Sequence, residues 1–371
     1  MSTDKTSIFI NEEEIPFVRN DKDIFLNKLC MIYGPSGSGK TQIILHLLHL
    51  LKDHIPNAIV ANPTNQMNNT YTNIFPEPCI YTDVTKECLD GIYKRQEATV
   101  TMYKKVNNIN NLNKIFMKCA SIDEQNKLNS FNKSYQDTKK SIELSKDFHI
   151  TEKSAKITNL EQKHNTVILT FLKKIISIYK VKLETSGRMS PLELSIINCL
   201  YINPNLLILF DDTGHDIKNW QAYKETRTLF FNARHYCITT IITLQDDKIL
   251  DSALRKNVHI NFFTEAQTAI AFFTRSANNF SKKQQKKIEG IIEELFKENP
   301  GSKYKNYKKL CYFGALNQQT KKIQYIIANI YDKFRFGSDS YWQFCQQVQK
   351  KVDDDIQKSD MFSKLFLDDN N

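Results

Sequence analysis

The eight residues GPSGSGKT (34–41) follow the apolar stretch LCMIY (29–33) and precede QIILHLLHLLK (42–52). They contain three of the ten glycines in a chain of 371 residues, so a local need for glycine is indicated. The stretch before them has the length and composition of a buried strand, and the stretch after them carries apolar residues at helical spacing. The sequence therefore predicts a strand, a glycine-rich turn and a helix in direct succession.

This turn matches the pattern G-x-x-x-x-G-K-[ST], which binds the phosphates of a nucleotide. Glycine lets the backbone turn its N–H groups inward around an anion, and the N-terminus of the following helix adds partial positive charge. Lys40 can reach the β- and γ-phosphates, while the hydroxyl of Thr41 can bind Mg²⁺. A Gly/Ser turn with a chance Lys-Thr pair is the alternative, and the predicted strand and helix argue against it. The expected phosphate-binding residues are Gly34, Pro35, Ser36, Gly37, Ser38, Gly39, Lys40, Thr41 and Gln42.

Composition is typical of a globular protein. Hydrophobic residues make up 41% of the chain, and 371 residues can form one large core or two domains. No apolar run reaches the length of a bilayer-spanning helix, and the acidic start MSTDKTSIFINEEE (1–14) does not resemble a signal peptide.

The eight cysteines form no C-x-x-C pair, and Cys199 and Cys237 lie in apolar runs. We expect buried free thiols in a reducing compartment rather than disulfides or a zinc site.

The net charge of +10 is concentrated in one segment. Residues 94–182 contain 18 Lys and Arg against 8 Asp and Glu, whereas the remainder has 33 of each. The segment is also rich in Asn, Ser and Gln and lacks Pro and Gly, which predicts a mostly helical insertion. Its charge would suit a DNA backbone. A solvated face without such a partner is the alternative, because A/T-rich coding sequence also produces Lys and Asn.

The stretch NLLILFDDTG (205–214) supplies the acidic residues that a phosphate-binding loop requires. Leu206–Phe210 is a continuous apolar run, as expected for a central parallel strand, and ligands bind at the carboxyl ends of such strands. We expect Asp211 to hold Mg²⁺ through water and Asp212 to act as the catalytic base toward the attacking water. Asp is one methylene shorter than the Glu common at the second position. An ordinary Asp-Asp-x-Gly turn is the alternative.

Two helices and two strands are predicted after this acidic pair. Residues 217–232 have a helical pattern, 236–244 a β-branched apolar one, 249–254 that of a short helix, and 258–263 that of another strand. Gln245 ends the first of these strands beside the expected γ-phosphate, where its amide could hydrogen-bond the attacking water or detect the phosphate. An exposed glutamine in a turn is equally ordinary.

An arginine is expected to complete the catalytic residues, because a guanidinium stabilises the charge that develops on a transferring phosphoryl group. A neighbouring subunit often supplies it. Arg255 lies just before the 258–263 strand and ranks first, Arg234 ranks second, and Arg188 is a third candidate. The alternative for each is a surface ion pair of small energetic value.

Taken in order, GPSGSGKT, LLILFDDTG, NARHYCITTIITLQ and LRKN resemble the DNA-packaging ATPases of nucleocytoplasmic large DNA viruses, the poxvirus-type enzymes of the FtsK/HerA superfamily. The resemblance covers residues 28–85 and 188–275. It implies an α/β fold with a RecA-like P-loop NTPase core, in which helices flank a central, mostly parallel sheet. The helical Lys/Asn-rich insertion and a C-terminal extension lie outside the matched parts. It also implies a motor that uses ATP and Mg²⁺, assembles as a ring of six or five subunits, and pumps double-stranded DNA into a viral capsid, at its portal vertex.

The resemblance also implies roles by position and a location. Arg255 would act on the ATP of the next subunit, and the site of action would be the viral factory in the host cytoplasm, with association with the virion as an alternative. The nucleotide machinery implied by position is Lys40, Thr41, Asp211, Asp212 and Gln245.

The predicted organisation follows from these matches. The segments are an N-terminal segment (1–27), the first part of the core (28–93), the basic insertion (94–187), the second part of the core (188–280) and a C-terminal extension (281–371). Smaller elements expected outside the motifs are strands at 57–61, 78–82, 309–316 and 323–331 and helices at 281–301 and 341–356.

Other functions stay open. A small-molecule phosphotransferase, or a DNA-dependent ATPase or helicase without a packaging role, would use the same loop. A GTPase switch is disfavoured because the chain has no N-K-x-D tetrad. An inactive scaffold is disfavoured because Lys40, Thr41 and both aspartates are intact.

Overall fold

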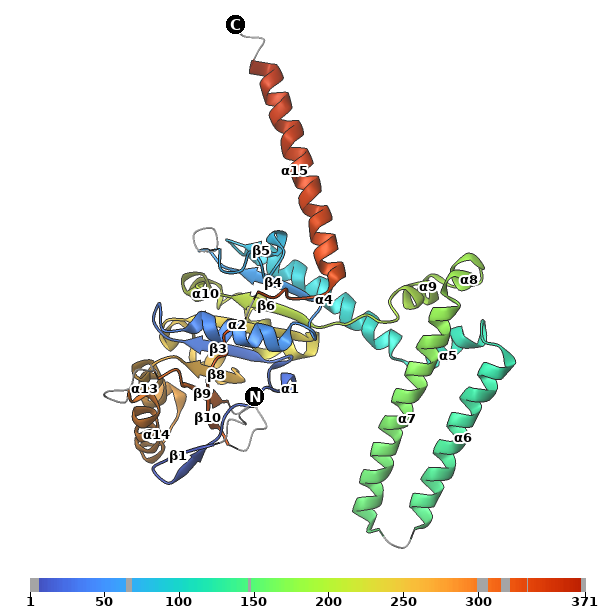
Figure 1. Ribbon diagram of the computed structural model, residues 1–371, viewed down its shortest axis with the longest axis horizontal. Helices are drawn as coiled ribbons and strands as arrows, with labels where there is room; N and C mark the ends of the chain where they lie inside the picture. The colour runs from blue at the N-terminus through green and yellow to red at the C-terminus, as the bar shows by residue number, and fades with distance from the viewer. Residues whose placement is uncertain are drawn as a thin grey trace. The chain divides into compact units, whose positions relative to one another are not determined.

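The structure is a computed structural model that describes residues 7–64, 69–145, 148–298, 306–314, 321–331 and 333–367, with side chains described to residue 355. The chain divides into two compact units, one made of residues 1–96 and 205–371 and the other of residues 97–204 (Figure 1). Each unit has hydrophobic clusters of its own.

An eight-stranded sheet, counted within the described residues, forms the first unit in the order β10-β9-β8-β3-β7-β6-β4-β5. The strands from β8 to β5 run parallel, and the β9–β10 hairpin joins β8 in the antiparallel direction. The expected α/β fold with a mostly parallel sheet is therefore confirmed. The strands are β3 (Leu29–Tyr33), β4 (Asn57–Ala61), β5 (Ile80–Tyr81), β6 (Leu206–Phe210), β7 (Ile238–Leu244), β8 (Ile260–Phe263), β9 (Lys309–Phe313) and β10 (Ile323–Ile326).

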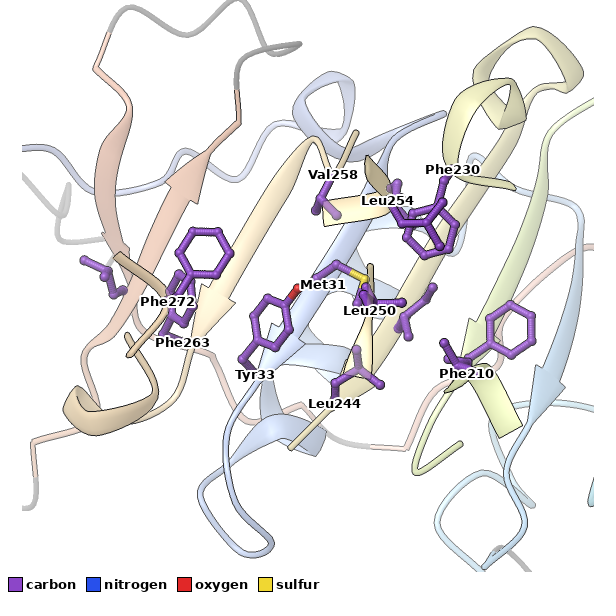
Figure 2. Close-up of a cluster of buried hydrophobic side chains, with 14 of the residues drawn as sticks. Met31, Tyr33, Phe210, Phe230, Leu244, Leu250, Leu254, Val258, Phe263 and Phe272 are labelled. Carbon is purple, nitrogen blue, oxygen red and sulfur yellow. The ribbon is translucent and has the colours of Figure 1, made fainter. Parts of the chain in front are cut away.

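The central strands are buried on both faces. Every residue of β3, β6 and β7 is buried, which explains their continuous apolar sequences. Along β3, Met31 and Tyr33 belong to one hydrophobic cluster, while Cys30 and Ile32 belong to a second, as the alternation of a pleated strand requires. Figure 2 shows part of the first cluster around Met31 and Tyr33. The second includes the apolar face of helix α2 (Lys40–Leu51).

Helices connect and cover these strands. Helix α4 (Lys86–Val106) begins in the first unit and continues into the second. Other elements of the first unit are the hairpin β1 (Ile8–Ile10) and β2 (Glu13–Ile15), and the α-helices α1 (Lys22–Phe25), α10 (Gly214–Trp220), α11 (Lys224–Phe231), α12 (Ser252–Lys256), α13 (Ala266–Thr274), α14 (Lys282–Phe296) and α15 (Asp339–Leu367).

Two predicted helices were wrong in extent. The pattern at 217–232 is divided between α10 and α11, which are separated at residues 221–223. The pattern at 249–254 is a 3₁₀ turn (Asp247–Ile249) followed by α12, because the Asp251 carboxylate accepts a hydrogen bond from the Leu254 N–H and starts the helix there.

The C-terminal extension was predicted as a helix, a hairpin and a closing helix, and this order is confirmed. The hairpin adds its two strands to the edge of the main sheet beside β8. Helix α14 ends at Phe296, before the Pro300-Gly301 stop that the sequence predicts, and α15 continues to Leu367, beyond the predicted end at 356. Among the described side chains of α15, only Tyr341 and Cys345 are buried.

The second unit is helical throughout its described secondary structure, so the expected helical insertion is confirmed. Its core joins the C-terminal half of α7 (Ile150–Ile178) to α5 (Ile109–Met117), with Phe116 and Leu172 fully buried. Farther along the α6–α7 pair the contacts become polar, as where the rings of Tyr135 and His164 stack 4.3 Å apart. The helices are α5 (Ile109–Met117), α6 (Ile122–Leu144), α7 (Ile150–Ile178), α8 (Lys180–Thr185) and α9 (Pro191–Asn198).

The cysteines fit the expected thiols with one difference. All eight are free, and Cys30, Cys311 and Cys345 are buried, but Cys199 and Cys237 are only half-buried. Among the helices that the structure describes, none combines the length and the apolar character needed to cross a bilayer.

Candidate nucleotide-binding site

The glycine-rich turn forms the loop that its sequence predicts. It leaves the carboxyl end of β3 and enters α2 at Gly39, which has a φ of +98° and precedes the first helical residue. Gly34 has a φ of +155°, and a Cβ there would lie 1.8 Å from the Thr264 hydroxyl oxygen. Gly39 is therefore required because of its backbone conformation, and Gly34 because a side chain there would collide with Thr264.

Lys40 lies over this loop. Its Nζ donates hydrogen bonds to the carbonyl oxygens of Gly34 and Pro35, at 2.8 Å each. Burial lowers the pKa of Lys40, whereas the nearby carboxylates of Asp211 and Asp212 act in the opposite direction. The ammonium is thus held by the loop within the electrostatic reach of the acidic pair.

The acidic pair lies at the carboxyl end of β6, held by its neighbour β7. The Thr243 hydroxyl of β7 donates to Asp211 Oδ1 at 2.8 Å and accepts from the Asp212 backbone N–H at 3.0 Å. Asp212 takes a left-handed conformation with a φ of +58° and is exposed, whereas Asp211 is buried. One threonine therefore fixes the carboxylate of Asp211 and the backbone of Asp212.

Tyr71 was not anticipated from the sequence. Its hydroxyl donates to Asp211 Oδ2 at 2.8 Å, and Asn62 lies 3.5 Å from the same oxygen. Burial and the charge of Asp211 raise the pKa of Tyr71, so it stays a hydrogen-bond donor. Tyr71 lies in the Pro/Asn-rich stretch after β4, and no sequence pattern there indicates a residue of the site. Thr243 could have been predicted, because it lies two residues before Gln245 on the same strand.

A cavity of about 280 Å³ brings the predicted residues together. Lys40, Asp212 and Gln245 line it, on three different elements that meet at the carboxyl edge of the sheet. Asp211 is not among the lining residues but accepts a hydrogen bond from Thr243, which is, and Thr41 and Gln42 lie in the first turn of α2. The full lining is Lys40, Asp212, Gly214, His215, Thr243, Leu244, Gln245 and Ile249.

The residues present fit Mg²⁺ bound mainly by phosphate and water. Asp211 presents a carboxylate, held in place by Tyr71 and Thr243, and Thr41 adds a hydroxyl at the helix N-terminus. No cluster of three or more His, Cys, Asp or Glu that could hold a metal ion occurs in the described part of the chain. This donor set suits Mg²⁺, which keeps several waters and binds few carboxylates.

Arg255 does not fit the role that the sequence suggested. Its side chain is buried, and its Nη1 donates to the carbonyl oxygens of Asp247 and Leu250, at 2.8 and 2.6 Å. Its Nε also donates to Asn278 Oδ1 at 3.2 Å. A residue that reaches the ATP of another subunit must be exposed, so this geometry contradicts the expectation and indicates a structural role within its own subunit.

The other two arginines are exposed. Arg234 lies in a 3₁₀ turn (Ala233–Tyr236) before β7, and Arg188 lies between α8 and α9 of the second unit. Because Gln245 follows the opposite end of β7, Arg234 is at the other edge of the sheet from its own phosphate loop. Arg234 is therefore separated from the phosphate loop of its own chain by the length of β7.

Asp247 anchors the loop that carries Gln245. It is 2% exposed, and its carboxylate accepts two hydrogen bonds of 2.7 Å from Arg275. Arg255 holds the Asp247 carbonyl and forms a 3.8 Å ion pair with its carboxylate. Two arginines thus fix a position two residues after Gln245. The sequence showed neither Asp247 nor Arg275, since both look like ordinary surface residues.

Three proteins of large DNA viruses have sequences similar to this chain. No protein-family model matches it. The uncharacterized protein B354L of African swine fever virus, in the Kenya KEN-50 isolate, is 28% identical over 350 residues, covering 91% of this chain and 92% of B354L. The chain is thus similar to B354L along most of both sequences. Shorter matches, both 33% identical, are to protein L437 of Acanthamoeba polyphaga mimivirus over 86 residues and to protein 075L of invertebrate iridescent virus 6 over 67 residues.

These two matches cover 21% and 18% of this chain, and 29% and 26% of the relatives.

The solved structures that resemble this chain include a viral NTPase and a bacterial coupling protein. The genome packaging NTPase B204 of Sulfolobus turreted icosahedral virus 2, in complex with AMP, is 10% identical with a TM-score of 0.35, covering 83% of this chain and 98% of that chain. The bacterial conjugative coupling protein TrwBdeltaN70 is 10% identical with a TM-score of 0.33, covering 91% of each chain.

Proposed function

We propose that the chain is an ATPase that couples hydrolysis to the movement of double-stranded DNA into a viral capsid. The observation that carries the enzymatic part is the cavity that Lys40, Asp212 and Gln245 line together. Homology to B354L along nearly the whole chain supports a viral role. Packaging itself is inferred from the ordered motifs, which resemble those of viral packaging ATPases.

The phosphate loop would bind the triphosphate of ATP. Its backbone N–H groups and the N-terminus of α2 supply positive potential, and Lys40 would exchange its two carbonyl partners for phosphate oxygens. Asp211 and Thr41 would hold Mg²⁺, which neutralises negative charge on the phosphates when bound. Tyr71 and Thr243 keep the Asp211 carboxylate in one orientation.

Asp212 and Gln245 would act on the attacking water. Asp212 is exposed to the cavity, so its carboxylate can accept a proton from water there. Gln245 lines the same cavity, and its amide can hydrogen-bond the water or the γ-phosphate. The Thr243 hydroxyl on the Asp212 N–H stabilises the left-handed backbone that presents this carboxylate.

A ring of six or five subunits would complete the site. Arg234 is exposed at the edge of the sheet away from its own phosphate loop, which suits a residue acting on a neighbour's ATP. The proposed partners are double-stranded DNA and the capsid or its portal vertex, and the proposed place is the viral factory in the host cytoplasm or the virion.

The second unit is proposed as a DNA-binding surface. Residues 97–204 contain 17 Lys and Arg against 10 Asp and Glu. Lys104 and Lys114 are examples of exposed basic residues on it. Positive charge of this kind binds a DNA backbone with a strong dependence on salt. Reversing the charge of exposed lysines should reduce the slope of DNA affinity against salt concentration, and an unchanged slope would remove this surface from the proposal.

The deciding experiment measures ATP hydrolysis with and without double-stranded DNA. We expect hydrolysis that DNA stimulates, and its loss in Lys40→Ala, with Lys52→Ala as a control lysine at the end of α2. A hydrolysis rate that DNA does not change would contradict the proposed motor function. Transfer of phosphate to a free nucleoside would indicate a phosphotransferase instead. DNA-stimulated hydrolysis without DNA uptake into capsids would indicate a motor with another role.

A further inference from the structure

Lys309 of the C-terminal hairpin lies at the phosphate loop. Strand β9, which it begins, runs antiparallel to β8, and β8 runs parallel to β3. The start of β9 is therefore at the same edge of the sheet as the carboxyl end of β3, where the loop begins. The pairing of Leu310 with Phe263 places Lys309 beside Thr264, the residue after β8.

The ammonium of Lys309 binds two backbone carbonyls at this junction. Its Nζ donates to Ser38 O at 3.1 Å and to Thr264 O at 2.7 Å. Thr264 is also tied to the loop, because its hydroxyl lies 2.6 Å from the Ser38 hydroxyl. The side-chain stem of Lys309 passes 3.7 Å from the position that a Cβ on Gly39 would occupy. One cation thus joins the loop, the end of β8 and the start of β9.

The contact with Ser38 has a consequence for the next backbone N–H. In a planar trans peptide the carbonyl and the N–H point in opposite directions. A cation bound to the Ser38 carbonyl therefore holds the Gly39 N–H on the side of the peptide away from Lys309. It also polarises the peptide, which strengthens the N–H as a donor. Gly39 belongs to the loop whose N–H groups are proposed to receive phosphate.

We propose that Lys309 is a positioning residue for the triphosphate, which sets the orientation and the donor strength of the Ser38–Gly39 peptide. The inference rests on the proposed function of the loop as an ATP site. It gives the C-terminal hairpin, which lies outside the phosphate-binding motif, a direct influence on nucleotide affinity. A lysine whose role was only to stabilise the sheet would change the melting temperature and leave affinity unchanged.

The test compares Lys309→Met with Lys308→Met. Both changes remove one positive charge from adjacent positions, but the hydrogen bonds to Ser38 O and Thr264 O come from Lys309, and Lys308 lies before the first residue of β9. For Lys309→Met we expect the Kd for ATPγS and the KM for ATP to rise about tenfold, with kcat changed by less than about twofold. Lys308→Met should match the wild type, and Lys309→Arg should recover much of the affinity because it keeps a cation there.

Calorimetric titration of the full chain with ATPγS separates the outcomes. Binding by Lys309→Met equal to that of the wild type, alongside lost binding in Lys40→Ala, would overturn the role of Lys309 and leave the proposed function standing. A wild type that binds no ATPγS would overturn the proposed function itself. If Lys309→Met does not fold, Lys309→Leu also removes the donor, and unchanged affinity in that variant would equally refute the inference.

Discussion

Arg255 offers the sharpest test of the site, because the sequence and the structure assign it different roles. Its guanidinium makes two hydrogen bonds to carbonyl oxygens and faces the buried carboxylate of Asp247. Arg255→Ala removes these two hydrogen bonds and a third to Asn278 Oδ1, and a hydrogen bond of a charged group is worth about 1.5–3 kcal/mol. Such terms are not additive, and Arg275 still neutralises Asp247, so we expect the free energy of unfolding to fall by about 3–5 kcal/mol, as for a broken buried ion pair.

Arg234 is the matched comparison. It is exposed, so Arg234→Ala should change the free energy of unfolding by less than about 0.5 kcal/mol. If it acts on a neighbour's ATP, the same change should lower the DNA-stimulated kcat about a thousandfold. Urea unfolding followed by circular dichroism gives the first quantity, and an ATPase assay gives the second.

The result that would refute this reasoning is also defined. If Arg255→Ala unfolds at the same urea concentration as the wild type but loses ATP hydrolysis, the buried contacts are not its main role. Recovery of activity on mixing Arg255→Ala subunits with Lys40→Ala subunits would then indicate action in trans. Unchanged hydrolysis in Arg234→Ala would remove Arg234 from the proposed site.

Three further predictions concern the acidic pair and a buried histidine. Asp212→Asn should bind ATPγS normally but hydrolyse ATP at least about a hundredfold more slowly, since it removes the proposed base; equal turnover would exclude that role. Tyr71→Phe should cost about 1–3 kcal/mol in urea unfolding, because it deprives the buried Asp211 carboxylate of a donor, and no change would show that water replaces the hydroxyl. Burial, with the charges of Lys28 and Arg234, lowers the pKa of His259 to about 4, and its Nδ1 accepts from the Leu29 N–H. Below about pH 6.5 the histidine gains a proton in the unfolded chain but stays neutral in the folded one until about pH 4. The free energy of unfolding should therefore fall as the pH drops through this range, by at most about 1.4 kcal/mol per pH unit. In His259→Gln the urea midpoint should change less with pH over the same range.

Much of the fold could be predicted because it depends on neighbouring residues. The strands at 29–33 and 206–210 were predicted to the residue, since a run of buried apolar side chains bounded by polar ones defines them. The pattern at 217–232 was less informative. A helical period persists across a short break, so two helices were predicted as one.

The sequence by itself determined the phosphate loop and the acidic pair, because glycine conformation and the order of residues along the backbone decide their local geometry. Only the tertiary structure decided which side chains surround them. Tyr71 reaches Asp211 across 140 residues, and Lys309 reaches Ser38 across 271. The tertiary structure also determines that Arg255 is buried and that Arg234 is exposed. The physical reason is that backbone conformation follows from adjacent residues, whereas the partner of a polar side chain depends on how distant segments pack.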